Sequence, residues 1–270
     1  MKTLLTAGLL FLGACASKPH QKLIVDTDSG LFQGESLLRV AGDVPDASGL
    51  KSCYQGDLSG FTERARLEFS KSAKNTQYWT WVGNCLSWHN ELREARFFFG
   101  LALDLAKTKE EQALVKNNLA VLHLRQGRVS KAYDLLVEAR ALAPQFVTPA
   151  FNLAQLYVGQ NLNQEALKIL LQPPFEKSQN AEVLHLKGLA YLQASQLKEA
   201  GAFLAQIPAR YHGREDVALT LAKWHLHEGR PREAQGLLKN YSSTGLSVPK
   251  TIAERLDREV DRQIAALEGK

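Results

Sequence analysis

The most regular feature of the chain is a small residue followed, four positions later, by a bulky apolar one. This pair occurs five times, and successive occurrences are separated by 37, 34, 34 and 34 residues. A period in this range is typical of helix-turn-helix solenoids, because one short hairpin cannot bury its apolar face alone and must stack on copies of itself. The five pairs are Ala95/Phe99, Ala132/Leu136, Ala166/Leu170, Ala200/Leu204 and Ala234/Leu238.

Residues at fixed offsets from each small residue support the same register. Five positions earlier the chain has Asn, Gly or Ser, which tolerate a tight or left-handed turn. Twelve positions earlier it has Gly or Ala, as expected where two helices approach closely. The predicted turn residues are Asn90, Gly127, Asn161, Ser195 and Gly229, and the predicted close-approach residues are Gly83, Ala120, Ala154, Gly188 and Ala222.

These offsets resemble the tetratricopeptide repeat (TPR) family, whose spacing of small, aromatic and Pro positions the chain follows over residues 76–245. The resemblance implies an all-α solenoid with about five full repeats, a degenerate repeat before them and a capping helix after them. Three departures fall on the second helices of repeats, where Pro173, Ile207 and Tyr241 replace the usual Ala. The resemblance therefore does not define the exact packing of the second helices.

Two segments flank the repeats. Residues 35–75 are predicted to form an N-terminal helical segment or degenerate repeat, with a helix over 58–74. Residues 246–270 carry an apolar stripe opposite charged residues, which predicts a helix that covers the last repeat. The stripe consists of Ile252, Leu256, Val260, Ile264 and Leu267.

The first 14 residues predict a lipoprotein signal peptide. Lys2 precedes an apolar run that is too short to span a bilayer permanently, and the run ends in Leu-Gly-Ala-Cys. This ending resembles the bacterial lipoprotein signal, which implies that Cys15 becomes the lipid-bearing first residue. The alternative is an ordinary cleaved signal peptide with an incidental cysteine. Residues 15–34 lack helical periodicity and predict a flexible tether behind the lipidated Cys15.

Ala16 follows the predicted lipidated residue. By resemblance to sorted lipoproteins, this residue favours the outer membrane of a Gram-negative cell. The protein is then expected to be lipid-anchored and to face the periplasm.

Cys53 and Cys85 remain as an even pair in a chain that is expected to reach an oxidising space. If the degenerate repeat exists, both lie late in the first helices of adjacent repeats, so a disulfide between them is geometrically reasonable. The alternative is two buried free thiols that pack as small apolar groups.

Composition and motifs do not indicate nucleic-acid binding, metal binding or catalysis. The formal net charge of +5 is spread over interspersed basic and acidic residues, which does not indicate nucleic-acid binding. His123 and His225 occupy equivalent positions of different repeats, and no metal-binding, nucleophile-elbow or phosphate-loop motif accompanies them. We predict no catalytic residues, no metal and no cofactor, and hence no enzyme.

Stacked repeats turn their first helices toward an inner groove, where the family binds peptides. Asn84, Asn118 and Asn152 recur there at 34-residue steps, and their amides can both donate to and accept from an extended backbone. Aromatic residues add apolar anchoring area. Alternatively, the Asn residues only favour solvent on an unused face. The predicted groove residues are Trp81, Asn84, Trp88, Asn117, Asn118, Arg125, Phe151, Asn152, Gln155, His185 and Lys223.

The expected function is a non-catalytic scaffold or assembly lipoprotein that binds periplasmic or outer-membrane proteins. TPR lipoproteins of this kind serve pilus, secretion or motility machines, and the resemblance reaches only this class. An adaptor that recruits or regulates peptidoglycan hydrolases or synthases is the alternative, and an enzyme of unrecognised type is a more distant one.

Overall fold

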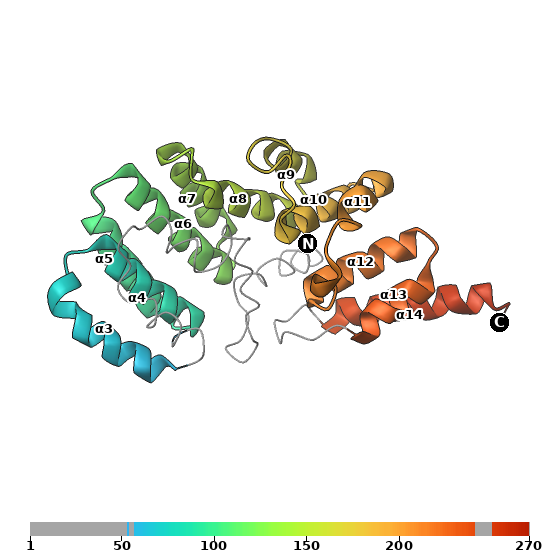
Figure 1. Cartoon of the computed structure of the whole chain (residues 1–270), viewed down its shortest axis with the longest axis horizontal. Helices are drawn as coiled ribbons and strands as arrows, with labels where there is room; N and C mark the ends of the chain where they lie inside the picture. Colours follow the sequence, from blue (N-terminus) through green and yellow to red (C-terminus); the bar gives the residue numbers. More distant parts are fainter. Residues whose placement is uncertain (1–52, 54–56, 241–249, 270) are drawn as a thin grey trace. The chain divides into compact units, whose positions relative to one another are not determined.

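The computed structural model describes residue 53 and residues 57–240 and 250–269 (Figure 1). These residues form twelve α-helices and one short 3-10 helix, and they contain no β-strand. The chain divides into two compact units. We call them the N-terminal unit, which ends at Leu153, and the C-terminal unit, which is described from Ala154 onward.

The N-terminal unit consists of consecutive helices joined by short connections. Side-chain caps fix several starts: Asn75 accepts from the backbone of Gln77 at 2.7 Å, and Thr108 and Glu111 form a reciprocal capping box. The helices are α3 (Leu58–Ser72), α4 (Thr76–Trp88), α5 (Leu92–Leu105), α6 (Lys109–Arg125), α7 (Val129–Leu142) and the first half of α8 (Val147–Gly159).

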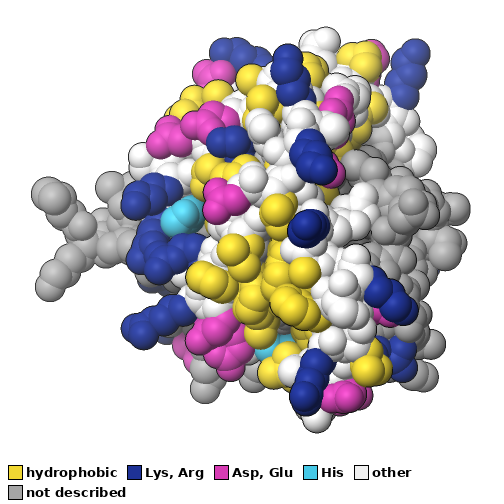
Figure 2. All heavy atoms as spheres, turned by 90° about the vertical axis from the view of Figure 1, so that its left-hand side faces the viewer, with side chains coloured by type: hydrophobic (Ala, Val, Ile, Leu, Met, Phe, Trp, Pro, Cys, Tyr) yellow, Lys and Arg dark blue, Asp and Glu magenta, His cyan; other side chains and the backbone are white. Residues whose placement is uncertain are grey.

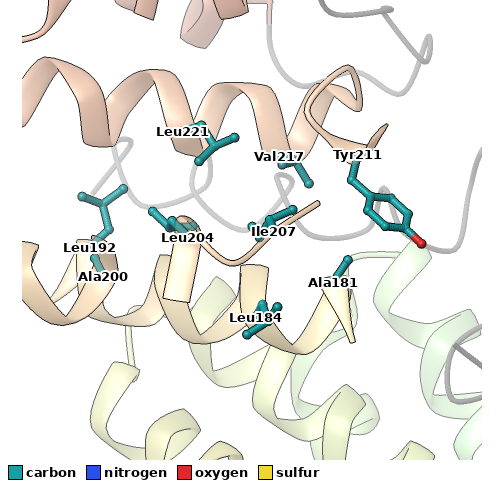
Figure 3. Close-up of a cluster of buried hydrophobic side chains, with 9 residues drawn as sticks. All are labelled: Ala181, Leu184, Leu192, Ala200, Leu204, Ile207, Tyr211, Val217 and Leu221. Carbon is teal, nitrogen blue, oxygen red and sulfur yellow. The ribbon is translucent and has the colours of Figure 1, made fainter. Parts of the chain in front are cut away.

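The C-terminal unit continues the pattern of hairpins. Figure 3 shows apolar side chains of α10, α11 and α12 that meet in one cluster, which Ile207 and Tyr211 close from the connection between α11 and α12. The elements after α8 are α9 (Asn163–Leu170), α10 (Ala181–Gln193), α11 (Leu197–Leu204), η2 (Ala209–Tyr211), α12 (Glu215–His227), α13 (Pro231–Asn240) and α14 (Lys250–Leu267).

All five predicted turn residues adopt a left-handed backbone. Their φ angles lie between 59° and 70°. In each turn the next residue donates its N–H to the carbonyl five positions earlier, as Glu91 does to Leu86 at 2.8 Å. This bond pairs a helix-end carbonyl that the helix itself leaves unsatisfied. The sequence prediction of the five hairpin turns is confirmed.

The predicted contact between small and bulky residues is also present. A Cβ atom on Gly83 would lie 2.6 Å from the ring of Phe99, and one on Gly188 would lie 2.5 Å from the side chain of Leu204. The five repeated Ala residues are fully buried, and the bulky residues four positions later are buried beside them. The register therefore follows from side-chain volume at these positions.

Two second helices are short, and in each the departure from the repeat pattern follows the end of the helix. α9 and α11 have 8 residues each, whereas α5 and α7 have 14. After α9 the chain turns through residues 171–177, and the ammonium of Lys187 binds the carbonyls of Phe175 and Glu176 at 2.7 and 2.8 Å. Lys187 is fully buried. Its charge is thus satisfied by carbonyls that a longer helix would have paired internally.

The ends of the array are helical where they are described. α3 lies within the predicted helix 58–74, and α14 lies within the predicted capping segment. Val260 of α14 is 1% exposed and packs with Leu226 and Leu238, so α14 covers the last hairpin. The predicted signal peptide and tether lie outside the described residues, as do most of residues 35–56 and residues 241–249.

Candidate functional site

Two of the three predicted aromatic anchors, Trp81 and Phe151, lie on first helices but are buried. Trp81 of α4 is 4% exposed, because Phe61 of α3 packs against its indole with the ring centroids 4.5 Å apart. Phe151 of α8 is 1% exposed. Contrary to the prediction, neither ring offers exposed apolar area to a partner.

Three predicted asparagines form a chain of amide contacts in the N-terminal unit. Asn152 donates from Nδ2 to Oδ1 of Asn117 at 2.8 Å, and Asn117 donates to Oδ1 of Asn118 at 3.3 Å. All three side chains are more than nine-tenths buried. The Nδ2 group of Asn118 is buried and has no hydrogen-bond partner within the described part of the chain. One amide hydrogen bond therefore links α8 to α6, one lies within α6, and the Nδ2 donor of Asn118 is left over.

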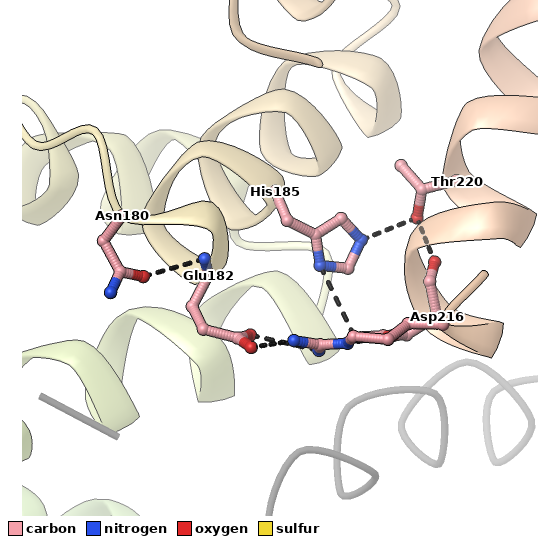
Figure 4. A network of polar contacts seen from close by, with 6 residues as sticks. Asn180, Glu182, His185, Asp216 and Thr220 are labelled. Carbon is pink, nitrogen blue, oxygen red and sulfur yellow. Dashed lines mark hydrogen bonds and ion pairs between the residues drawn. The ribbon is translucent and has the colours of Figure 1, made fainter. Parts of the chain in front are cut away.

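A second polar network joins α10 and α12 in the C-terminal unit (Figure 4). Arg214, the residue before α12, donates to both carboxylate oxygens of Glu182 and to Oδ2 of Asp216 at 2.6 Å. His185 places Nε2 2.9 Å from Oγ1 of Thr220 and Nδ1 3.6 Å from Oδ2 of Asp216. The Thr220 hydroxyl also lies 2.9 Å from the backbone carbonyl of Asp216, to which it donates.

Burial and charge shift the pKa values in this network in different directions. Burial lowers the pKa of His185, and nearby Asp216 opposes that shift only in part. Burial alone would raise the pKa of Asp216, but His185 and Arg214 outweigh it and hold the pKa below its usual value. Burial alone would lower the pKa of Arg214, but Glu182 and Asp216 raise it. The carboxylate of Asp216 and the guanidinium of Arg214 are therefore charged at neutral pH.

The side chain of Arg125 forms hydrogen bonds within the protein instead of facing a ligand. Its guanidinium donates to the backbone carbonyl of Ser87, to the hydroxyl of Ser87 at 3.0 Å and to Oδ1 of Asn90 at 3.4 Å. The contact joins the end of α6 to the turn between α4 and α5. Arg125 therefore positions two successive hairpins.

The other residues predicted to line the groove are accessible to solvent. In the N-terminal unit, Asn84 and Trp88 on α4 are half-buried. In the C-terminal unit, Gln155 on α8 is half-buried and Lys223 on α12 is exposed. Each unit thus presents polar side chains on its first helices to a partner.

Cys53 and Cys85 form a disulfide, with their Cα atoms 5.8 Å apart. Both residues are fully buried in the cluster that contains Phe61 and Trp81. His89, the residue that ends α4, places Nε2 3.0 Å from the carbonyl oxygen of Cys53. The bond therefore ties the chain before α3 to the end of α4.

An apolar face lies on the N-terminal unit, and Figure 2 shows its side chains gathered near the middle of that view. On α3 and α5, Phe69 is 50% exposed and Phe97 is 62% exposed. Their rings contact Trp79 and Phe98, which stack on each other with centroids 5.3 Å apart. This aromatic row lies outside the predicted groove positions.

Comparison with known proteins agrees with the hairpin geometry. Residues 123–190 match the family model for the tetratricopeptide repeat. The chain thus contains tetratricopeptide repeats within residues 123–190. Its structure is similar to the crystal structure of YrrB, described as a TPR protein with an unusual peptide-binding site, at a TM-score of 0.50 and 16% identity over 72% of this chain and 97% of that one. No curated protein sequence matches the chain.

Sequence reasoning missed four polar residues of the TPR protein: Glu182, Arg214, Asp216 and Thr220. Glu182 and Asp216 both lie at the second position of their helices, so the repeat register places them side by side at adjacent helix starts. Two acidic residues at this shared position were the available signal, because adjacent carboxylates favour a cation between them. Arg214 precedes its helix and carried no such signal.

The predicted lipidation site, Cys15, lies outside the described residues. Within the described ranges, no helix has the length and apolar character needed to cross a membrane. The lipid anchor at Cys15 therefore stays a prediction from the sequence.

Proposed function

We propose that this TPR-repeat protein is a non-catalytic scaffold that binds an extended segment of another protein along its first helices. The observation that carries the proposal is the buried Nδ2 donor of Asn118, which has no partner in the described structure. A backbone carbonyl of a bound segment would supply the missing acceptor, after a small movement of the side chain. The half-buried Asn84 on the preceding first helix adds a second amide.

The fold supports a protein ligand only by analogy. YrrB is described as having a peptide-binding site, but at 16% identity the similarity concerns the fold. The proposal for this chain therefore rests on its own first-helix residues.

Site-specific photo-crosslinking in cells tests the binding surface. A crosslinking residue at position 84 on α4 should capture an identified protein, because Asn84 lies on the proposed face. The control is the same residue at position 131 on α7, where Lys131 is exposed on a second helix. Equal capture of the same protein from both positions would remove the first helices as the binding surface.

We further propose that the scaffold is anchored by lipid at Cys15 to the periplasmic face of the outer membrane and serves a pilus, secretion or motility machine. The support is the Leu-Gly-Ala-Cys sequence followed by Ala16. Cys15→Ser should move the protein from the membrane fraction to the soluble fraction, and unchanged membrane association would contradict the anchor. Capture of secretin or motility subunits supports this assignment, whereas capture of peptidoglycan hydrolases or synthases supports the adaptor alternative.

A further inference from the structure

Two groups of metal-ligating side chains occur among the described residues. Glu182, His185 and Asp216 form the first, but the guanidinium of Arg214 already forms ion pairs with both carboxylates. Cys53, Cys85 and His89 form the second. This group has the softer ligands and lies against an apolar cluster.

The second group has the spacing of a zinc site. His89 donates its backbone N–H to the carbonyl of Cys85 at 3.0 Å, so the two residues are one helical turn apart on the same face of α4. Two ligands four residues apart on a helix are a frequent half of zinc sites. Nε2 of His89 faces the carbonyl of Cys53. The potential ligand atoms of all three residues lie within 4.8 Å of one another.

We propose that Cys53, Cys85 and His89 bind one Zn²⁺ ion when the disulfide is reduced. Zinc prefers thiolate and imidazole ligands in a tetrahedral arrangement, and three protein ligands leave a fourth position for water. Two thiolates, a neutral imidazole and Zn²⁺ together carry no net charge. This neutrality suits a site packed against Phe61 and Trp81, because a net charge is costly to bury.

The two states of the site exclude each other. A trialkylphosphine transfers two electrons to the sulfur–sulfur bond and takes up an oxygen atom from water, so the products are two thiols and one phosphine oxide. Zn²⁺ then displaces two thiol protons to the solvent as the thiolates bind it. The oxidised chain has no thiolate ligand and should not bind the metal here.

Cobalt binding tests the proposal on the full-length chain with Cys15→Ser, which removes the third thiol. The chain is reduced by phosphine in denaturant and refolded without oxygen in the presence of Co²⁺. We expect one Co²⁺ per chain, thiolate-to-cobalt charge-transfer absorption, two protons released per ion and displacement of cobalt by Zn²⁺. His89→Ala should weaken binding at least about tenfold. The matched control is His227→Ala, because His227 is an exposed histidine of α12.

Several results would overturn the site. They are no cobalt uptake by the refolded reduced chain, equal affinity in the His89→Ala variant, or the same binding by the disulfide-bonded chain. If the reduced chain refolds only with metal, judged by helical circular dichroism, the site is supported. If it fails to refold even with metal while the oxidised chain refolds, the zinc-bound state is excluded. Crosslinking from position 84 uses the oxidised chain, so the scaffold proposal stands or fails separately.

Discussion

The side-chain amide of Asn152 donates a 2.8 Å hydrogen bond to Asn117, which lies 35 residues earlier in the chain. The same separation recurs in the C-terminal unit, where His185 contacts Thr220 at 2.9 Å. Both pairs join one first helix to the next, one position beyond the 34-residue period. Polar side chains thus contribute to the contacts between successive first helices in both units.

Asn117→Ala should lower the free energy of unfolding by about 1–3 kcal/mol, because it leaves the buried amide of Asn152 without its acceptor. Asn84→Ala is the matched control, since Asn84 is only half-buried on a neighbouring first helix. We expect it to change stability by less than about 0.5 kcal/mol. Urea unfolding followed by circular dichroism measures both. Equal losses in the two variants would show that the amide contact adds no stability.

Turns and close contacts could be predicted from the sequence because a single residue decides each of them. A left-handed backbone at Asn161 or Gly229 and a missing side chain at Gly188 are local requirements. Exposure could not be predicted in this way. Trp81 is covered by Phe61 of α3, a helix outside the regular repeats, so its burial depends on a contact that the period does not contain.

The hydrogen-bond partners of the polar groove residues could not be predicted from the sequence either. The repeat register identified Asn117, Asn152 and His185 as first-helix residues, and the structure places them there. Whether their side chains face a ligand or the next helix depends on the spacing between helices, which a sequence period does not specify. Arg214 lies before its helix and gained its role only from the packing of α10 against α12.

Gly188→Ala should destabilise the fold by about 1–3 kcal/mol, because the added Cβ would lie 2.5 Å from Leu204 in a packed contact. Gly236→Ala on α13 should have the opposite sign. Its Cβ would meet no atom within 4 Å, and Ala is favoured over Gly in a helix by about 0.5–1 kcal/mol. Thermal unfolding of both variants checks the prediction. A stable Gly188→Ala variant would mean that the helices of this hairpin are not in close contact.

The disulfide should contribute about 3–4 kcal/mol, the size expected from closing a loop between residues separated by 32 positions. Cys53→Ser with Cys85→Ser in the Cys15→Ser chain should lower the urea midpoint accordingly. Thiol titration of the Cys15→Ser chain in non-reducing denaturant should detect no thiol. Two thiols per chain would show that the cysteines are not bonded, and a mutant as stable as its parent would show that the bond adds no stability.

Acid should destabilise the C-terminal unit through His185 before it affects Asp216. Burial lowers the pKa of His185 in the folded state, so the unfolded chain binds a proton more readily. The stability that this lowered pKa contributes is fully present above about pH 6.5, the pKa of histidine in the unfolded chain. It is lost as the pH falls toward the pKa of His185 in the folded state. Asp216 also has a lowered pKa, and its contribution is lost only at more acidic pH, below about 3.9.

The variant His185→Asn isolates this effect, because His123 and His225 also have pKa values lowered by burial and remain in place. Removing His185 should reduce the slope of unfolding free energy against pH just below pH 6.5, where its folded and unfolded states differ in protonation. Urea unfolding at a series of pH values provides the measurement. If the His185→Asn variant and its parent lose stability in parallel between pH 7 and pH 5, His185 takes up its proton equally in both states and the network does not respond to pH through it.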